Sequence, residues 1–345
     1  MKKEVLGVER LVRTKYTPMI LMNSTFEPGK VMEFALSIEE SINRDMAIAE
    51  YYYFTGNHVE NAKIVSKYLN HDDLIVKASA WLMYSFCNMT LCKQEETKRG
   101  MEFVHDMIKA YQSGMVGEEE HAMIVLVANA ANVLIHLQID EIPTLNKYLS
   151  LLPPGLRVFG CYIMAHQAYL KGEYEKGLGI VETSLSLCGE KYLIPSIYLY
   201  LAGAMNAMSI DKVELGKEYF LKAYNLAKPD ELFEPLGEHH GLLQGLIEIC
   251  LKKSEKEYYE KIIAITYRFS YGWRRVHNPI TSENVADTLT TTEFSVAMLA
   301  NRGWTNNEIA DYLEVNVNTV KSHITSVFNK LGINSRKELN EFMLR

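Results

Sequence analysis

Hydrophobic and polar residues along the first 270 or so positions follow the spacing expected of helices. No stretch of useful length alternates apolar and polar residues as a half-buried strand would. Helix-breaking segments divide the region, namely Ser113-Gly114, Pro153-Pro154-Gly155 and Lys228-Pro229-Asp230. The pattern predicts an all-α region made of consecutive helices.

The most apolar stretch is AMIVLVANAANVLI, residues 122–135. It is shorter than the roughly 20 residues that a membrane span requires, and it carries Asn129 and Asn132. We therefore expect a buried helix there and no membrane partner. The first three residues are followed at once by Glu4, so they are not followed by the apolar core of a signal peptide. A cytoplasmic protein is expected.

A weak repeat divides the helical region. Small residues that would lie on the second helix of a pair occur at positions 62, 100, 177 and 216. Their separations of 38, 77 and 39 residues fit a period of about 38 to 39 if one weak unit lies near position 139. Two antiparallel helices approach closely where one of them presents Gly or Ala. The spacing therefore predicts stacked helical pairs.

The best-marked unit, residues 165–177, resembles the tetratricopeptide repeat. It carries Gly172 and Tyr174 in the family's Gly-x-Tyr-x-x-Ala order, with Gly177 in place of the usual Ala. The period is longer than the roughly 34 residues of that family. Long-period arrays of this kind resemble those that precede the DNA-binding domain in MalT-like regulators. The resemblance implies a tetratricopeptide-like sensor or interaction domain over residues 1–273.

The last sixty residues contain strong helix-start and helix-stop signals. Three Ser/Thr-x-x-Glu capping boxes predict helix starts, and each pairs a hydroxyl cap with a carboxylate three residues later: Thr290 with Glu293, Thr305 with Glu308, and Ser335 with Glu338. Gly303 and Gly332 stand where a left-handed residue ends a helix, and Asn316 is a further N-cap. These signals predict helices over 291–302, 306–313, 317–331 and 336–343, with a turn at Glu314-Val315.

The third of these predicted helices has one apolar and one polar face. The apolar face should pack against residues 296, 299, 309 and 313, and it is formed by Val320, Ile324, Val327, Phe328 and Leu331. The opposite face presents Asn318, Lys321, Ser322, Thr325 and Asn329. Small polar side chains and one lysine can approach base edges in a DNA groove without the cost that Glu or Phe would impose.

The charge of the chain is unevenly distributed. The formal net charge is −7, yet residues 289–345 hold six acids and six bases and are neutral. Residues 317–337 contain Lys321, Lys330, Arg336 and Lys337 and no acid. A DNA backbone would meet this local basic patch rather than the average charge of the chain.

The order of residues in this region resembles the LuxR-type (NarL/FixJ-like) DNA-binding domain over roughly the last 57 residues. The matching segments are Leu289-Thr290-x-x-Glu293, Gly303-x-Thr305-Asn306-x-Glu308-Ile309-Ala310, Thr319-Val320-Lys321-x-His323, Lys330-Leu331-Gly332 and Ser335-Arg336. The resemblance implies a four-helix module that binds double-stranded DNA as a homodimer, reads the major groove with its third helix and pairs through its fourth. Thr292, Ser295 and Thr325 depart from the usual Arg, Glu and basic residue, so base preference and phosphate affinity can differ.

Seven residues are predicted to contact DNA. Lys321, in the middle of the polar face, is the first choice for a base or phosphate contact. Asn318 and Thr319 lie in the first turn, where backbone amides can meet a phosphate. Ser322 and Thr325 are candidates for base-edge or methyl contacts, and Lys330 and Arg336 for contacts with the DNA backbone. His323 borders the buried face, and a structural role is expected for it.

Other clusters favour no chemistry. We find no supported catalytic arrangement, so an enzyme is not expected. His239-His240 and Glu238 lack a third ligand at helical spacing, and Gly29-Lys30 lacks the earlier glycine of a phosphate loop, so neither a metal nor a cofactor is predicted. The five cysteines should be reduced, buried thiols. Several aromatics, among them Tyr53, Trp81 and Tyr198, could line a ligand groove, but inter-helix packing is expected for most.

The sequence thus predicts an all-α chain with a repeat domain over 1–273, a linker over 274–288 and a LuxR-type helix-turn-helix domain over 289–345. The leading hypothesis is a transcription regulator whose repeat domain senses a small molecule or a protein partner. The alternative is a protein-interaction scaffold tethered to DNA without small-molecule sensing. A contact with RNA polymerase is a further partner to consider, and the sequence does not distinguish activation from repression.

Overall fold

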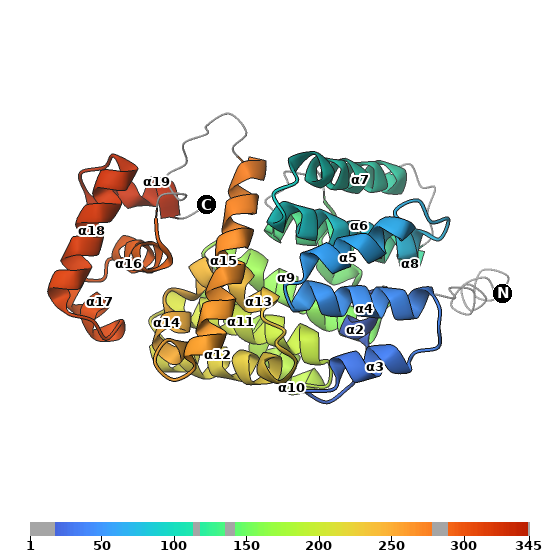
Figure 1. Cartoon of the computed structure of the whole chain (residues 1–345), viewed down its shortest axis with the longest axis horizontal. Helices are drawn as coiled ribbons and strands as arrows, with labels where there is room; N and C mark the ends of the chain where they lie inside the picture. The colour runs from blue at the N-terminus through green and yellow to red at the C-terminus, as the bar shows by residue number, and fades with distance from the viewer. Residues whose placement is uncertain (1–17, 113–117, 135–141, 278–288, 344–345) are drawn as a thin grey trace.

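The computed structural model describes residues 18–112, 118–134, 142–277 and 289–343, and within these ranges every regular element is helical (Figure 1). Residues 18–277 form what we call the helical body. Its elements are α2 (Ile20–Asn23), α3 (Val31–Ser37), α4 (Ile42–Phe54), α5 (His58–Val65), η1 (Ser66–Tyr68), α6 (Leu74–Thr90), α7 (Gln94–Gln112), α8 (Glu118–Leu134), η2 (Leu145–Lys147), η3 (Leu149–Leu151), α9 (Pro154–Leu170), α10 (Tyr174–Cys188), α11 (Leu193–Ser209), α12 (Val213–Ala227), η4 (Lys228–Asp230), α13 (Glu234–Glu238), η5 (His240–Leu243), α14 (Leu246–Leu251) and α15 (Lys256–His277).

Residues 289–343 form the C-terminal domain, which lies at one end of the molecule (Figure 1). Its elements are α16 (Thr291–Asn301), α17 (Asn306–Tyr312), α18 (Val317–Leu331), η7 (Arg336–Leu339) and α19 (Asn340–Met343). The two regions have separate apolar cores, and Tyr312 packs against both.

Helical pairs recur along the body. The small residues at positions 62, 100, 177 and 216 lie on α5, α7, α10 and α12, each the second helix of a pair. A Cβ on Gly100 would lie 1.8 Å from Ser85 Oγ, and one on Gly177 would lie 2.3 Å from Asn206 Oδ1, so both positions permit close helix approach. The weak unit expected near position 139 falls outside the described residues. The tetratricopeptide character of these pairs stays a prediction.

The body also closes on itself through contacts between distant segments. In a simple solenoid each repeat contacts only its neighbours. Here α15 packs against α6 and α7, and α13 packs against α4 (Figure 1). The Asp230 carboxylate accepts hydrogen bonds from the amides of Gly29 at 2.5 Å and Val31 at 3.1 Å. These contacts produce a compact body rather than an open superhelix.

The apolar stretch at 122–135 forms most of α8, and its residues through Val133 are nearly all buried, as predicted. Asn129 is accommodated there because its side-chain amide donates to the carbonyls of Val125 at 2.8 Å and Pro143 at 3.1 Å. In the described part of the chain, no helix has both the length and the apolar character that crossing a membrane would require.

Two expectations need correction. Helix α15 continues through His277, so the first four residues of the predicted linker are helical. The rest of the linker, 278–288, lies outside the described residues. The five cysteines are free thiols, but only Cys87 is buried, and Cys188 at the end of α10 is exposed.

Candidate nucleic-acid interface

The apolar face of α18 forms the centre of the C-terminal core, as predicted. Val320 and Val327 have no exposed surface, and Ile324 and Leu331 are buried. They pack in one cluster with Val296, Leu299 and Ile309, and Phe328 and Leu313 lie partly buried at its edge. Because this face is held by α16 and α17, the opposite face of α18 is directed away from the core.

Two of the three predicted capping boxes form and fix the starts of α16 and α17. The Glu293 amide donates to Thr290 Oγ1 at 3.2 Å, while the Thr290 amide donates to Glu293 Oε2 at 2.7 Å. Thr305 and Glu308 make the same reciprocal pair at 3.3 and 2.7 Å. Each box satisfies amides that would otherwise have no partner at a helix start.

The third box does not form as predicted. Ser335 Oγ donates to Glu338 Oε1 at 2.5 Å, and the other carboxylate oxygen accepts from the Asn334 amide at 3.3 Å instead of the Ser335 amide. The segment begins as the 3-10 helix η7 and becomes α-helical only at Asn340. A 3-10 turn is tighter than an α-turn, so its first residues do not have the geometry of a capping box.

The ends of the helices agree with the glycine and asparagine signals. Gly303 and Gly332 have φ values of 91° and 63°, the left-handed conformation expected at a helix end. Asn316 caps α18 by accepting a hydrogen bond from the Asn318 amide at 2.8 Å. In the predicted turn, Glu314 also has a positive φ of 51°. Together α17, this turn and α18 form the helix-turn-helix.

Five of the seven predicted DNA-contact residues lie together on the exposed face of α18. Every one of them is solvent-exposed: Asn318, Thr319, Lys321, Ser322 and Thr325. Among the described residues, Lys321 has no acid within ion-pair distance, so its ammonium is available to a phosphate or a base. His323 is half-buried, and the structural role expected for it stays a prediction.

The backbone at the start of α18 is already engaged. The Asn318 amide donates to the Asn316 side chain, and the Thr319 amide donates to the Asn316 carbonyl at 2.9 Å. A phosphate contact by these amides would have to replace the internal bonds. The Thr325 hydroxyl donates to the Lys321 carbonyl at 3.0 Å. Side chains rather than amides are therefore the main donors that this surface offers.

Lys330 lies within a charged cluster that the sequence reasoning missed. Its ammonium donates to Glu293 Oε2 at 2.7 Å, and Ser326 Oγ donates to Glu293 Oε1 at 2.7 Å. Burial alone would raise the pKa of Glu293, but the hydrogen bonds from Lys330, Ser326 and the Thr290 amide lower it to about 2. Glu293 thus caps α16 and ties it to α18. The capping motif indicated only the first of these roles.

Arg336 also has an internal role. Its guanidinium donates to the Trp304 carbonyl and to Asn306 Oδ1, and the residue is half-buried. These bonds join the last segment of the domain to the start of α17. Contacts of Lys330 and Arg336 with a DNA backbone remain predictions, and both side chains have protein partners in this structure.

A docking contact between the C-terminal domain and the body is the second feature that sequence reasoning missed. Arg302 donates to Ser209 Oγ at 2.8 Å and to the Tyr169 hydroxyl at 2.9 Å. The Phe294 ring rests on Gly241, where an added Cβ would lie 2.7 Å from the ring. Leu313 is similarly close to Gly245. No local motif signals such a contact, because its partners are far apart in sequence.

Further contacts extend this docking surface along α17. The Tyr312 hydroxyl lies 3.9 Å from Met208 Sδ, and burial raises the pKa of Tyr312 above its usual range. Lys253 of the body forms an ion pair with Glu314. The contact therefore involves α16, α17 and the turn, while the predicted DNA-contact residues of α18 stay exposed.

The histidine pair and its neighbouring acid are engaged in hydrogen bonds. His239 Nε2 lies 2.8 Å from the Tyr162 hydroxyl, and His240 Nε2 lies 2.8 Å from Glu248 Oε1. Glu238 accepts from Tyr53 and Tyr198. Within the described ranges, no group of three or more His, Cys, Asp or Glu residues has the geometry of a metal site.

Comparison with known families identifies the C-terminal region. The family described as "Bacterial regulatory proteins, luxR family" matches residues 287–343, so the chain ends in a LuxR-family helix-turn-helix domain. The family match covers only this part of the chain.

Individual relatives were found among curated proteins. The chain is 36% identical over 77 residues to the oxygen regulatory protein NreC of Staphylococcus aureus strain JH9 and to that of strain NCTC 8325 / PS 47. Each match covers 20% of this chain and 36% of the relative, so the chain spans about a third of the length of these relatives. No solved structure matches the chain.

Proposed function

We propose that this chain is a sequence-specific DNA-binding transcription regulator. The observation that carries the proposal is the exposed polar face of α18, presented by a LuxR-family domain whose core and caps hold that helix in place. An α-helix of this kind fits the major groove of B-DNA, where side chains read the edges of the bases. A regulator acting on chromosomal DNA would work in the cytoplasm.

The contacts would divide into two kinds. Lys321, Ser322 and Thr325 would approach the bases or the adjoining phosphates, with Asn318 and Thr319 at the groove edge. Lys330 and Arg336 would contact the DNA backbone only after loosening their bonds to Glu293 and to Trp304 and Asn306. Two copies of the domain would bind as a homodimer through residues 336–343, which form η7 and α19, and RNA polymerase is a further candidate partner.

The helical body is proposed to act as the sensor. Its helical pairs and glycine-lined approaches support a tetratricopeptide-like domain over 1–273, joined through 274–288 to the domain at 289–345. The contacts of Arg302, Phe294 and Tyr312 with the body give it a physical route to the DNA-binding domain. A ligand that altered this docking surface would change how the domain is presented to DNA.

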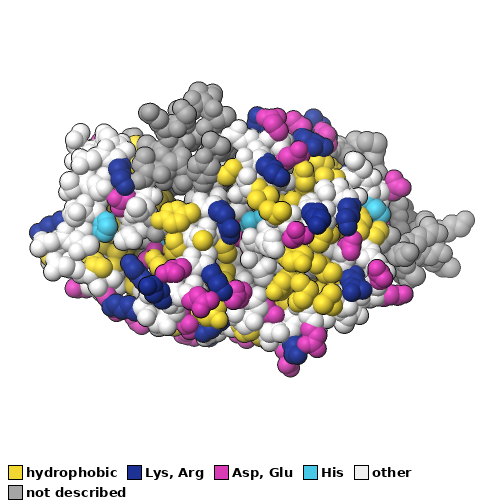
Figure 2. All heavy atoms as spheres, viewed as in Figure 1, with side chains coloured by type: hydrophobic (Ala, Val, Ile, Leu, Met, Phe, Trp, Pro, Cys, Tyr) yellow, Lys and Arg dark blue, Asp and Glu magenta, His cyan; other side chains and the backbone are white. Residues whose placement is uncertain are grey.

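The acidic body bears on the mode of regulation. The first 288 residues carry all of the −7 charge, and on the face seen in Figure 2 acidic and basic side chains are interspersed rather than gathered in one patch. Docking through α16 and α17 leaves the polar face of α18 exposed. Inhibition by covering that face is therefore not favoured. Regulation through orientation and dimer spacing fits this arrangement better.

Selection from fragmented genomic DNA tests the proposal. The full-length chain should retain a small set of fragments that share a sequence, and unlabelled copies of that sequence should compete far better than unrelated duplex at the same salt. Equal competition by all duplexes would contradict sequence-specific recognition. The genes beside the retained sites would also suggest the signal.

A further inference from the structure

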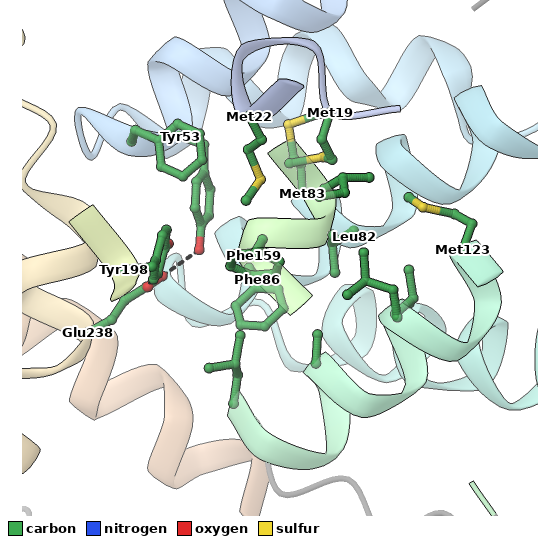
Figure 3. Close-up of a pocket in the computed structure, with 16 residues that line it drawn as sticks. Met19, Met22, Tyr53, Leu82, Met83, Phe86, Met123, Phe159, Tyr198 and Glu238 are labelled. Carbon is green, nitrogen blue, oxygen red and sulfur yellow. Dashed lines mark hydrogen bonds between the residues drawn. The ribbon is translucent and has the colours of Figure 1, made fainter. Parts of the chain in front are cut away.

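A cavity lies inside the helical body, between residues of α2, α4, α6, α8, α9, α11 and α13 (Figure 3). It contains about 610 Å³ of atom-free space, its opening included. The part that can hold a water-sized group measures about 50 Å³, and the larger figure includes space open to solvent. None of its described lining residues belongs to the C-terminal domain, so it is not part of the candidate DNA interface.

Most of the wall is apolar and adaptable. Four methionines line it. Met19 is the N-cap of α2, and the other three lie on α2, α6 and α8: Met22, Met83 and Met123. Figure 3 shows their side chains around the cavity. Phe159 adds an aromatic surface. Methionine is unbranched and polarizable, so such a wall can adjust to ligands of different outline. Among the residues that the structure describes, neither Lys, Arg nor His lines the cavity.

One end of the cavity is polar. The Glu238 carboxyl accepts hydrogen bonds from the Tyr53 hydroxyl and, at 3.2 Å, from the Tyr198 hydroxyl (Figure 3). Burial, followed by the nearby Glu234 carboxylate, raises the pKa of Glu238 above its usual range. The polar end therefore favours a neutral carboxyl flanked by two hydroxyls. Such a group can both donate and accept a hydrogen bond.

The wall formed by α2 is held firmly. Glu50 of α4 accepts hydrogen bonds from the amides of Leu21 at 3.0 Å and Met22 at 3.3 Å. Asn23 Oδ1 accepts from the Leu156 amide at 2.9 Å, and a Cβ on Gly155 would lie 1.8 Å from the Met22 carbonyl oxygen. Three bonds and one close backbone approach thus fix this short helix between α4 and α9. The cavity is a largely pre-formed site rather than a gap beside a loose segment.

We propose that this cavity binds a small, neutral, largely apolar molecule whose single hydroxyl group hydrogen-bonds to the Glu238, Tyr53 and Tyr198 cluster. The ligand class follows from the described lining: an anion would find no cation among these residues to pair with, and its desolvation would be uncompensated. An ammonium group would meet the Glu238 carboxyl, which favours its neutral form and so offers no full negative charge to pair with. The inference deepens the proposed function, on which its role as a signal rests.

The cavity and the docking surface share helix α11 and are also linked through the neighbouring elements α13 and η5. Helix α11 carries Tyr198 at the cavity and Met208 and Ser209 at the contacts with Tyr312 and Arg302. Glu238 lies three residues before Gly241, on which Phe294 rests. A ligand that shifts the polar end of the cavity would therefore act directly on the elements that position the C-terminal domain.

Competition for a fluorescent probe tests the ligand class on the full-length chain. N-phenyl-1-naphthylamine, a neutral and mainly apolar fluorophore, should bind with saturable fluorescence enhancement. 1-Octanol should displace it at concentrations at least tenfold lower than octanoate or octylammonium at pH 7. Equal displacement by the three compounds, stronger displacement by either ion, or a non-saturable signal would overturn the proposal.

Two variants test the location. Ala130→Leu adds bulk to the α8 wall and should weaken probe binding at least tenfold, and the gentler Val127→Ile should weaken it less, in the same direction. Leu187→Ser removes an apolar side chain that is 81% exposed and should leave binding unchanged. Far-ultraviolet circular dichroism shows whether each variant is folded. Folded wall variants with unchanged binding, or loss of binding in Leu187→Ser, would contradict an internal site.

Parallel DNA-binding measurements separate the two proposals. Saturable probe binding without any DNA binding would leave the cavity assignment standing and overturn the regulator. Specific DNA binding with no probe binding would leave the regulator standing and overturn the cavity assignment. If both occur, octanol should change DNA affinity in the wild-type chain and not in Ala130→Leu. An unchanged affinity in both would remove the signalling role.

Discussion

The C-terminal domain and the helical body differ in how their sequences encode structure. In the C-terminal domain the contacts that set the starts of α16 and α17 are local: Thr290 and Glu293 are three residues apart, as are Thr305 and Glu308. In the body the contacts that close the fold join distant residues, such as Asp230 with Gly29 and Glu238 with Tyr53. Local contacts can be recognised in a sequence, whereas distant ones depend on how many helices pack together.

The difference extends to what each region does. The C-terminal domain presents its candidate site on the outside, on one face of a helix whose pattern already separates buried from exposed positions. The body encloses its candidate site, which is assembled from seven helices. An external helix face can be inferred from periodicity, but an internal cavity cannot. The predictions below test whether the two regions are as distinct as this comparison implies.

The largest effects should come from a matched pair of core truncations. Leu299 in the C-terminal domain and Leu199 in the body both have no exposed surface. Truncation of either to alanine should cost about 2 to 5 kcal/mol, through lost burial and the cavity left behind. Hydrogen exchange should show Leu299→Ala loosening mainly residues 289–343, and Leu199→Ala mainly the body. Equal loosening of both regions by each variant would contradict two separate cores.

Removal of Arg302 tests the contact between the regions. Arg302→Ala removes two charge-assisted hydrogen bonds, to Ser209 and Tyr169, and should weaken docking by about 1.5 to 3 kcal/mol. Small-angle scattering should then report a larger radius of gyration for the full-length chain. Arg99→Ala, at an exposed arginine that pairs with Glu96, is the control and should leave the radius unchanged. An unchanged radius in Arg302→Ala would argue against this contact in solution.

The helix caps should have intermediate effects. Thr290→Ala removes a complete capping box and should lower the unfolding free energy of the C-terminal domain by about 0.5 to 2 kcal/mol. Ser335→Ala should cost less, because Ser335 caps no backbone amide in the structure. Urea unfolding of the two variants measures the difference. A larger loss for Ser335→Ala would mean that the third box forms in solution after all.

The smallest effect is confined to acid conditions. The pKa of Glu293 lies at about 2 in the folded chain, below the usual glutamate value of 4.5. A carboxyl group whose pKa is lowered on folding stabilises the fold at pH values above its unfolded-state pKa. That contribution is lost as the pH falls from 4.5 through about 2. The C-terminal domain should therefore unfold at lower urea concentrations as the pH falls over this range. Glu293→Gln should reduce the pH dependence, and an identical acid profile would contradict the cluster with Lys330.

The sequence predicted the C-terminal domain closely because its signals are short in range. The bounds of α18, its buried face, two capping boxes and the left-handed glycines could all be inferred from residues at most eleven positions apart. The prediction of the third capping box was wrong, because a tight 3-10 turn replaced the expected helix start. The internal partners of Lys330 and Arg336 were missed because they come from other helices.

In the body the sequence indicated helices and helical pairs but not their assembly. The small residues at 100 and 177 were identified for their size, and their partners Ser85 and Asn206 only became known from the structure. Tyr53 and Tyr198 belong to the aromatics that could line a groove but for most of which packing was expected, and they line a cavity. Glu238 and His239 were assigned no metal from the sequence, and their tyrosine partners became known only from the structure. Each of these outcomes depends on contacts between distant segments.

The DNA affinity of Lys321→Ala tests the central claim most directly. Measured on a selected duplex over a range of salt concentrations, the variant should bind about 1 to 3 kcal/mol more weakly, and a phosphate contact by Lys321 would also lower the log–log salt slope by about 1. Lys252→Ala, at an exposed lysine of the body, should bind as tightly as the wild type. Unchanged affinity and slope in Lys321→Ala would contradict recognition through the exposed face of α18.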